Sequence, residues 1–406
     1  MMEGRRIASL DILRSIAVVF ILFFHSSIFN YANIHKIDFS NPPILIVLMS
    51  FMALWGGLFI IYSSVVNTYM LMQKDRQEQK ARQYRYVFIA GVVYIIFHFL
   101  LNIFLGRWTI DFVNNQPDLT AVASSLRNMR FTLPQFNKLF EGSSLSTIGI
   151  NLVALSLIAY LLLRNDGAER QRRNYWALGL SGSLIMLLSF VRVYIYPSFD
   201  KALADKDLLA SLFYSFTIAN PYPLIPYVAY GLFGMMIGMM VYHGRKDLLR
   251  WVAAPIGSAF LIYGIIGMLN LEKSISKPDY FWYFKTNFEL GVFIIMLISS
   301  LLVLSRANRL TDRLPLLKWF SRVSLTVYML ETTTSEILRL IGLRLLPSWN
   351  ETINGCLLFG VVNVGLWSLI LLLWSKVGFK YSIEHVWVAA FRRLGKSSTK
   401  LTGIGS

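Results

Sequence analysis

Residues 6–29 read RIASLDILRSIAVVFILFFHSSIF, a stretch long and apolar enough to be the first membrane-spanning helix of the chain. A span needs about 20 mostly apolar residues to cross the ~30 Å hydrocarbon core of a bilayer. This stretch nevertheless carries Asp11, Arg14 and His25. Because ionisable groups are costly in lipid, these three must face a cavity or another protein segment. The stretch therefore predicts both a membrane fold and a polar interior.

The composition extends this prediction to the whole chain of 406 residues. Hydrophobic residues make up 55% and charged residues only 15%, whereas soluble domains have roughly 25% charged residues. Many of the apolar residues are therefore expected to face lipid, instead of being buried in the core of a soluble domain. The one cysteine, Cys356, excludes an internal disulfide, and no cysteine pair of the zinc type exists, so we expect no metal site.

Hydropathy predicts an all-α fold, namely a polytopic bundle of about ten membrane helices. The predicted spans are 7–29, 44–72, 86–105, 145–163, 175–195, 222–243, 251–270, 287–305, 319–345 and 353–375. In the sixth span, Gly234 and Gly238 are four residues apart, a spacing that lets helix backbones approach closely. The pair favours helix packing and permits a homo-oligomer.

The net charge of +17 is distributed according to membrane topology. Alternate loops and the two termini hold 24 of the 39 Lys and Arg residues, and the remaining loops hold 10. The positive-inside rule explains this asymmetry and places both termini in the cytoplasm. Nucleic-acid binding is disfavoured because the charges do not gather on one domain.

Two regions are predicted from this arrangement. Residues 1–375 form the helical membrane domain, and residues 376–406 form a cytoplasmic amphipathic tail that lies at the membrane interface. The longest loop on the other side, 106–144, is expected to lie partly on the membrane or to re-enter it.

Polar residues of the first span fall on one stripe. Asp11 and Arg14 are three residues apart, so a local ion pair is expected. Arg14 and His25 are eleven apart, close to three turns, which separates them by roughly 16 Å along one face. The simpler structural explanation is a satisfied pair and a histidine at the level of the lipid headgroups. Three ionisable groups on one stripe favour a functional role instead.

Other spans add polar candidates. Asn67 lies in the second span and His98 in the third, and both are predicted to contact substrate together with Asp11. Glu331 lies in the middle of the ninth span without a local partner, so it either stays protonated or finds a distant cation such as Arg14. Glu336 and the arginine three residues after it are spaced for an internal pair, which usually joins helices.

The first stretch resembles the acyltransferase-3 family in its LDILRSIAVVFILFFH segment, residues 10–25. Its L-D-x-L-R start is followed by a histidine after ten intervening residues. Later segments are similar to relatives in the same transmembrane superfamily, which includes heparan-alpha-glucosaminide N-acetyltransferase. These segments are residues 220–238, where a proline-rich stretch enters a glycine-rich helix, the SLTVYMLE segment at 324–331, and the tail at 379–394.

The resemblance implies an integral membrane enzyme that takes an acyl group, most simply acetyl, from cytosolic acyl-CoA. The acceptor would be a hydroxyl or amine of a carbohydrate. The Arg14 and His25 positions match the family's arginine and histidine. No phosphate-binding glycine loop, nucleophile elbow, zinc motif or dinucleotide fingerprint offers a competing chemistry.

The chemistry of the residues agrees with that expectation. His25 is the predicted general base, or carries the acyl group briefly itself. Arg14 would orient the donor or stabilise charge on the thioester oxygen, and Glu331 would orient His25 or Arg14. The phosphates of CoA could be attracted by four basic loop residues, although topology alone also explains them. These are Lys74, Arg76, Lys80 and Arg82.

Two other functions stay open. A transporter or exporter would also use an intramembrane path of arginine, histidine and glutamate for protons or substrate. No internal repeat of the kind common in transporters is visible in the sequence. A scaffold or receptor would leave the polar stripe unexplained. The expected location is the plasma membrane of a bacterium or archaeon.

Overall fold

The computed structural model describes residues 7–37, 43–53, 55–73, 77–106, 109–111, 116–118, 120–134, 136–140, 142–164, 167–219, 222–269, 271, 279–303 and 314–390. Within these ranges the chain is helical apart from one short antiparallel hairpin of β1 (Thr109–Asp111) and β2 (Gln116–Asp118). The predicted helical class is therefore confirmed for the described residues.

Seven of the predicted spans correspond to one main helix each, whereas the second, fifth and ninth are each divided between two helices. The first half contains α1 (Ala8–Ile28), η1 (Ile34–Lys36), α2 (Ile44–Ala53), α3 (Gly56–Met72), α4 (Gln77–Leu100), η2 (Leu101–Leu105), α5 (Ala121–Asn128), η3 (Phe136–Leu139), α6 (Ser144–Leu163) and η4 (Gly167–Glu169). The second half contains α7 (Gln171–Leu188), α8 (Val191–Ala204), α9 (Leu208–Thr217), α10 (Leu224–Tyr242), α11 (Lys246–Leu248), η5 (Leu249–Ala253), α12 (Ala254–Met268), α13 (Tyr280–Val303), α15 (Pro315–Arg322), α16 (Ser324–Leu345), η6 (Trp349–Glu351) and α17 (Ile353–Ser375).

Among the described residues, seven helical segments are long and apolar enough to cross a membrane. An eighth is possible if α7 and α8, which meet at a bend of 60°, form one broken span. The chain is thus a multi-pass, membrane-type helical protein, and the count of ten stays a prediction. The difference comes from the second predicted span, divided between α2 and α3, and from the ninth, where α16 carries four charged residues.

The centre of the bundle is α10, which packs on α3, α6 and α7. Gly234 and Gly238 make the α10–α3 contact possible, as their spacing predicted. A Cβ atom on either glycine would lie 2.6 Å from a carbonyl oxygen of α3, that of Ile61 or Val65. Because both glycines face α3 of the same chain, they lend no support to a homo-oligomer.

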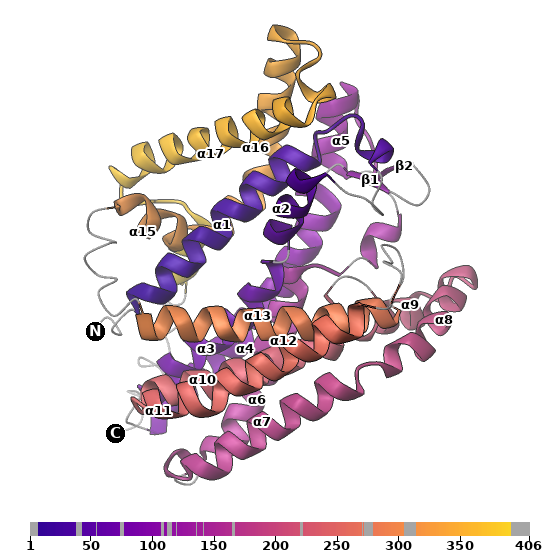
Figure 1. The fold of residues 1–406 in the computed structure, drawn as a ribbon. Helices are drawn as coiled ribbons and strands as arrows, with labels where there is room; N and C mark the ends of the chain where they lie inside the picture. The colour runs from indigo at the N-terminus through magenta and orange to yellow at the C-terminus, as the bar shows by residue number, and fades with distance from the viewer. Residues whose placement is uncertain are drawn as a thin grey trace, which may run out of the picture.

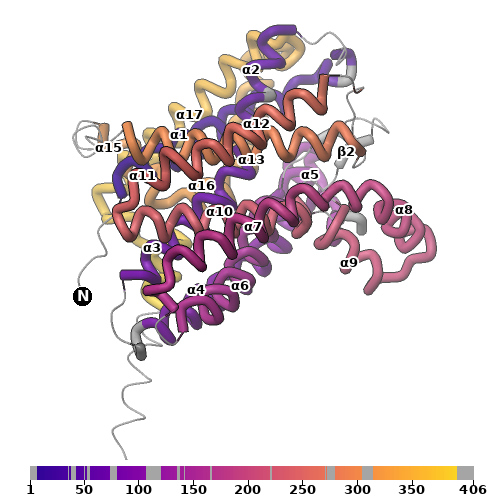
Figure 2. The backbone as a smooth tube through the Cα atoms, turned by 60° about the horizontal axis from the view of Figure 1, so that its bottom comes forward, coloured from indigo at the N-terminus to yellow at the C-terminus, as the bar shows by residue number. Residues whose placement is uncertain are grey.

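A second group of helices covers one side of this centre. It comprises α1, α15, α16 and α17, with α1 packed against the other three. In Figures 1 and 2, α17 lies along α1 over much of its length. The polar stripe of α1 is therefore enclosed by protein rather than exposed to lipid.

The two ends of the bundle differ in what they carry. The start of α1 lies at the same end as α11 and α15, whereas α5, the hairpin, α8 and α9 lie at the opposite end (Figure 1). The basic segment 243–250 and the beginning of α15 therefore lie at the same end as the start of α1, as the alternating charge of the loops predicts, whereas residues 305–313 lie outside the described residues. This arrangement defines a basic end and an opposite end of the protein.

The tail predicted for 376–406 is described as far as residue 390, and these residues contact the bundle. Phe379 is buried beside Trp367 and Leu371 of α17, and residues 383–390 are helical. Glu384 accepts hydrogen bonds from the backbone N–H groups of Leu325 (2.7 Å) and Thr326 (3.2 Å). A carboxylate at this place satisfies the unpaired first turn of α16. The ninth predicted span, 319–345, was wrong as a single helix, because α15 ends at Arg322 and Glu384 caps a new helix from Ser324.

Candidate functional site

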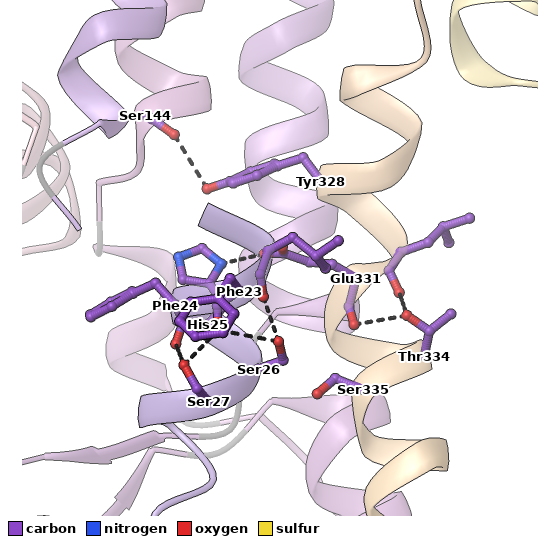
Figure 3. A network of polar contacts seen from close by, with 12 residues as sticks. Phe23, Phe24, His25, Ser26, Ser27, Ser144, Tyr328, Glu331, Thr334 and Ser335 are labelled. Atoms are coloured by element: carbon purple, nitrogen blue, oxygen red, sulfur yellow. Dashed lines mark hydrogen bonds and ion pairs between the residues drawn. The ribbon is translucent and has the colours of Figure 1, made fainter. Parts of the chain in front are cut away.

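The site centres on a histidine–carboxylate pair between α1 and α16. The Nδ1 atom of His25 is hydrogen-bonded to Oε1 of Glu331, and only 4% of Glu331 is exposed. Figure 3 shows the imidazole of His25 turned toward Glu331, with Tyr328 one turn earlier on α16. The ring of Tyr328 lies 6.4 Å from that of His25, centroid to centroid. Glu331 has no partner close to it in the sequence of α16. Its partner is His25 of α1.

A cavity of about 140 Å³ lies on one side of this pair. Glu331 forms one part of its wall and Arg14 another, and Asn67 of α3 also lines it. The remaining wall is largely apolar and aromatic, and includes Tyr62 and Ile148. The structure therefore brings together three of the predicted site residues in one cavity, although they come from three different helices.

The contacts of Arg14 differ from those predicted. No ion pair joins it to Asp11, whose carboxylate accepts a hydrogen bond from Ser321 of α15 (2.8 Å). The guanidinium instead lies over the ring of Tyr62, 5.5 Å from its centroid, and its buried Nε atom has no hydrogen-bond partner. The predicted Asp11–Arg14 pair was wrong because α15 supplies a better-placed partner for Asp11. The arginine keeps its charge directed at the cavity.

Glu331 also lines a second, smaller cavity of about 20 Å³ on its other side. His25 lines this one, as do Ser335 and Glu336 of α16 and Asn363 of α17. Glu331 is therefore shared by the two cavities, one containing Arg14 and the other containing His25.

A buried charge cluster closes the small cavity toward the opposite end of the bundle. Glu336 makes an ion pair with Arg339 (2.7 Å) and a second with Arg127 of α5. Arg127 also donates to Oδ1 of Asn30, just after α1, at 3.0 Å. The Glu336–Arg339 pair is confirmed, and Arg127 ties the short helix α5 to both α1 and α16.

Sequence reasoning missed Arg127 and Asn363, and it noted Glu384 only as part of the tail motif at 379–394. Arg127 did carry a signal, because it is a basic residue in a loop that the charge asymmetry assigns to the less basic side. Asn363 is a single asparagine in the middle of an apolar span, and nothing in the neighbouring sequence distinguishes it from a residue that joins helices.

His98 lies outside this site. It lines neither cavity; its Nδ1 shares a hydrogen bond with Ser143 (2.8 Å), and its ring packs on Phe216. Residue spacing gave no reason to prefer His25 or His98 as the base. The structure places His25 in the site and His98 outside it. Asp11, likewise, is absent from both cavity walls.

The structure describes two of the four predicted CoA-binding residues. Lys74 and Arg76 lie outside the described residues, and Arg82 is exposed. Lys80 lines a third cavity of about 440 Å³, together with Tyr84, Tyr242 and His243. This cavity is separate from the one that holds Arg14.

Within the described ranges, no group of three His, Cys, Asp or Glu side chains is arranged to hold a metal ion. The chain matches no protein-family model and no curated protein sequence. The resemblance of its first helix to membrane acyltransferases therefore stays a prediction.

Proposed function

We propose that the protein is an integral membrane acyltransferase of a bacterial or archaeal plasma membrane, with ten spans and both termini in the cytoplasm. It would move a short acyl group from cytosolic acyl-CoA to a hydroxyl or amine of a carbohydrate-type acceptor. The observation that carries the proposal is Glu331, which pairs with His25 and shares a cavity with Arg14. The base His25 and the cation Arg14 thus lie in two neighbouring cavities that share Glu331 as a wall.

Arg14 belongs to the donor half of the reaction. It is eleven residues from His25, roughly 16 Å along α1, so the two side chains do not act on the same carbonyl group. A role for Arg14 in stabilising the thioester oxygen next to His25 is therefore disfavoured. An arginine without an ion pair, near the basic end, suits binding of the amide or phosphate oxygens of the donor.

His25 belongs to the acceptor half. With Nδ1–H donating to Glu331, Nε2 is the nitrogen that accepts a proton, as in other histidine–carboxylate pairs. The acceptor O–H or N–H gives its proton to Nε2 while its oxygen or nitrogen attacks the thioester carbonyl. The C–S bond then breaks, and the CoA thiolate takes up that proton. A brief acyl-imidazole intermediate is the covalent version of the same step.

The third cavity offers a place for the nucleotide part of the donor. It combines the aromatic rings of Tyr84 and Tyr242 with the ammonium group of Lys80, at the beginning of α4. Aromatic faces and a cation suit a nucleobase with phosphates. In this proposal Lys80 is the described residue that contacts the phosphates of CoA.

The size of the Arg14 cavity predicts the length of the acyl chain. At about 140 Å³ it is close to the ~150 Å³ cavity that accommodates benzene in another protein. We expect acetyl- and propionyl-CoA to bind and palmitoyl-CoA to bind at least tenfold more weakly. Calorimetry over a chain-length series checks this. Replacing Ile148 with alanine should move the preference toward longer chains, and an unchanged preference would contradict this placement of the acyl group.

Binding of acetyl-CoA to the detergent-purified protein is the direct test of the donor. Arg14→Ala should weaken binding about 10- to 100-fold, because one or two charge-assisted hydrogen bonds are lost. Arg322→Ala is the matched control, since it removes an exposed arginine of α15 near the same end. If folded protein binds no acyl-CoA, the acyltransferase proposal is wrong.

A transporter is the second candidate, favoured by the continuity of ionisable groups from Arg14 through Glu331 and His25 to Glu336 and Arg127. Such a series is typical of proton paths in membrane proteins. Reconstituted vesicles decide between the two functions. Proton movement that depends on Glu331, in protein that does not bind acyl-CoA, would favour the transporter.

A further inference from the structure

Asn363 of α17 is a wholly buried polar side chain without a partner. Its exposure is 0%, and neither its Nδ2 nor its Oδ1 atom makes a hydrogen bond. Buried amide groups in proteins are almost always hydrogen-bonded to protein or to an ordered water, because an unmade bond forfeits free energy. An amide with both ends unsatisfied therefore indicates a ligand of matching polarity.

The small cavity beside His25 and Glu331 is where this side chain is directed, since Asn363 forms part of its wall. Gly360, one turn earlier, allows the approach of α17 to α1. A Cβ atom there would lie 2.9 Å from the ring of Phe23 and 3.1 Å from Cβ of Ser27. The close packing of α17 on α1 thus places Asn363 near the pair of His25 and Glu331.

The volume of this cavity fits one water molecule. It measures about 20 Å³, and a water needs a space of roughly 10–15 Å³ with two to four polar partners. The second carboxylate oxygen of Glu331, Oε2, accepts no hydrogen bond from any described residue. The hydroxyl of Ser335 accepts only a long bond of 3.5 Å from Asn30, and it donates to no described group.

We propose that Asn363, Ser335 and Glu331 bind a single buried water molecule. This water donates to Oε2 of Glu331 and to Oδ1 of Asn363, and accepts from Asn363 or Ser335. It holds the carboxylate of Glu331 in the orientation that receives Nδ1–H of His25. Asn363 is thus a positioning residue that acts through Glu331; this catalytic consequence rests on the proposed function, whereas the water site itself does not.

The water site is tested by an electron cryo-microscopy map of the protein in a lipid nanodisc, at a resolution that shows ordered waters. We expect density within hydrogen-bonding distance of the Asn363 amide and of Glu331 or Ser335. Asn363→Leu should abolish that density. An empty cavity in a map that shows waters elsewhere in the bundle would overturn the proposal.

Two substitutions of Asn363 test the positioning role. Leucine has nearly the shape of asparagine but fills the site with an apolar group, whereas alanine leaves room for a second water. The proposal predicts that Asn363→Leu lowers kcat at least tenfold with the KM of both substrates unchanged, and lowers the melting temperature by a few degrees. Asn363→Ala should keep more activity and stability than Asn363→Leu. A packing role alone predicts the opposite order.

Ser368→Ala is the control on the same helix, because its hydroxyl bonds only to the carbonyl of Val364 (2.8 Å). It should leave kcat and the melting temperature unchanged. If the wild-type protein has no transferase activity, the proposed function fails. The density and the order of melting temperatures still decide whether the water is bound.

Discussion

Replacing His25 with glutamine is expected to reduce acyl transfer by about 10²–10⁴-fold, the usual contribution of a general base. Glutamine can still donate a hydrogen bond to Glu331, so the contact between α1 and α16 is kept. The glutamine side chain cannot take up a proton. The O–H or N–H group of the acceptor must then attack the thioester while still protonated. The measurement is single-turnover transfer from acetyl-CoA, with acetyl-CoA binding followed separately, and we expect that binding to change little.

The matched control is His98→Gln, because His98 is also buried in a membrane helix but lines neither cavity. We expect it to keep most of the activity. Glu331→Gln should fall between the two, since it removes the charge that orients His25 but leaves the imidazole in place. Full activity in folded His25→Gln protein would exclude His25 as the base. Loss of activity in His98→Gln alone would transfer that role to His98.

Those features of the fold that depend on local sequence could be predicted. The positions of most spans follow from runs of about 20 apolar residues, which are independent of the partners they find. Gly234 and Gly238 predicted close packing, since a missing side chain allows approach wherever the neighbour comes from. Only the structure could identify that neighbour as α3.

The candidate site was predictable as a set of residues but not as an arrangement. Intramembrane charge singled out Arg14, His25 and Glu331, because the cost of burial applies to each of them separately. Spacing then suggested the wrong partner for Arg14. A spacing of three residues makes an ion pair possible, yet Ser321 from a distant helix hydrogen-bonds to Asp11 instead.

Contacts between segments that are far apart in the sequence could not be predicted from the sequence. Glu384 caps α16 from a segment almost 60 residues away, and this contact divides a predicted single span into α15 and α16. Such a contact depends on the packing of the whole bundle, which neither hydropathy nor helix periodicity contains. The same holds for Arg127, which reaches Glu336 from α5 at the opposite end.

The largest effect on stability is expected at Glu336. Its carboxylate is 5% exposed and lies between the guanidinium groups of Arg127 and Arg339. Glu336→Gln removes the negative charge that faces the guanidinium groups of Arg127 and Arg339. Removing one member of a buried ion pair usually costs about 3–5 kcal/mol, so we expect a clear loss of thermal stability in detergent and in lipid. Thermal unfolding followed by intrinsic fluorescence measures the change.

A double-mutant cycle separates charge from packing at this cluster. If the cost arises from the lost negative charge, Glu336→Gln combined with Arg127→Gln should be more stable than Glu336→Gln alone, since one of the two facing positive charges has also been removed. Glu351→Gln is the control, because this glutamate of η6 is exposed. Equal stability of the single and double variants would mean that Arg127 is not electrostatically coupled to Glu336. In that event α5 is held by its other contacts, and the cluster does not secure the outer wall of the cavity that contains His25.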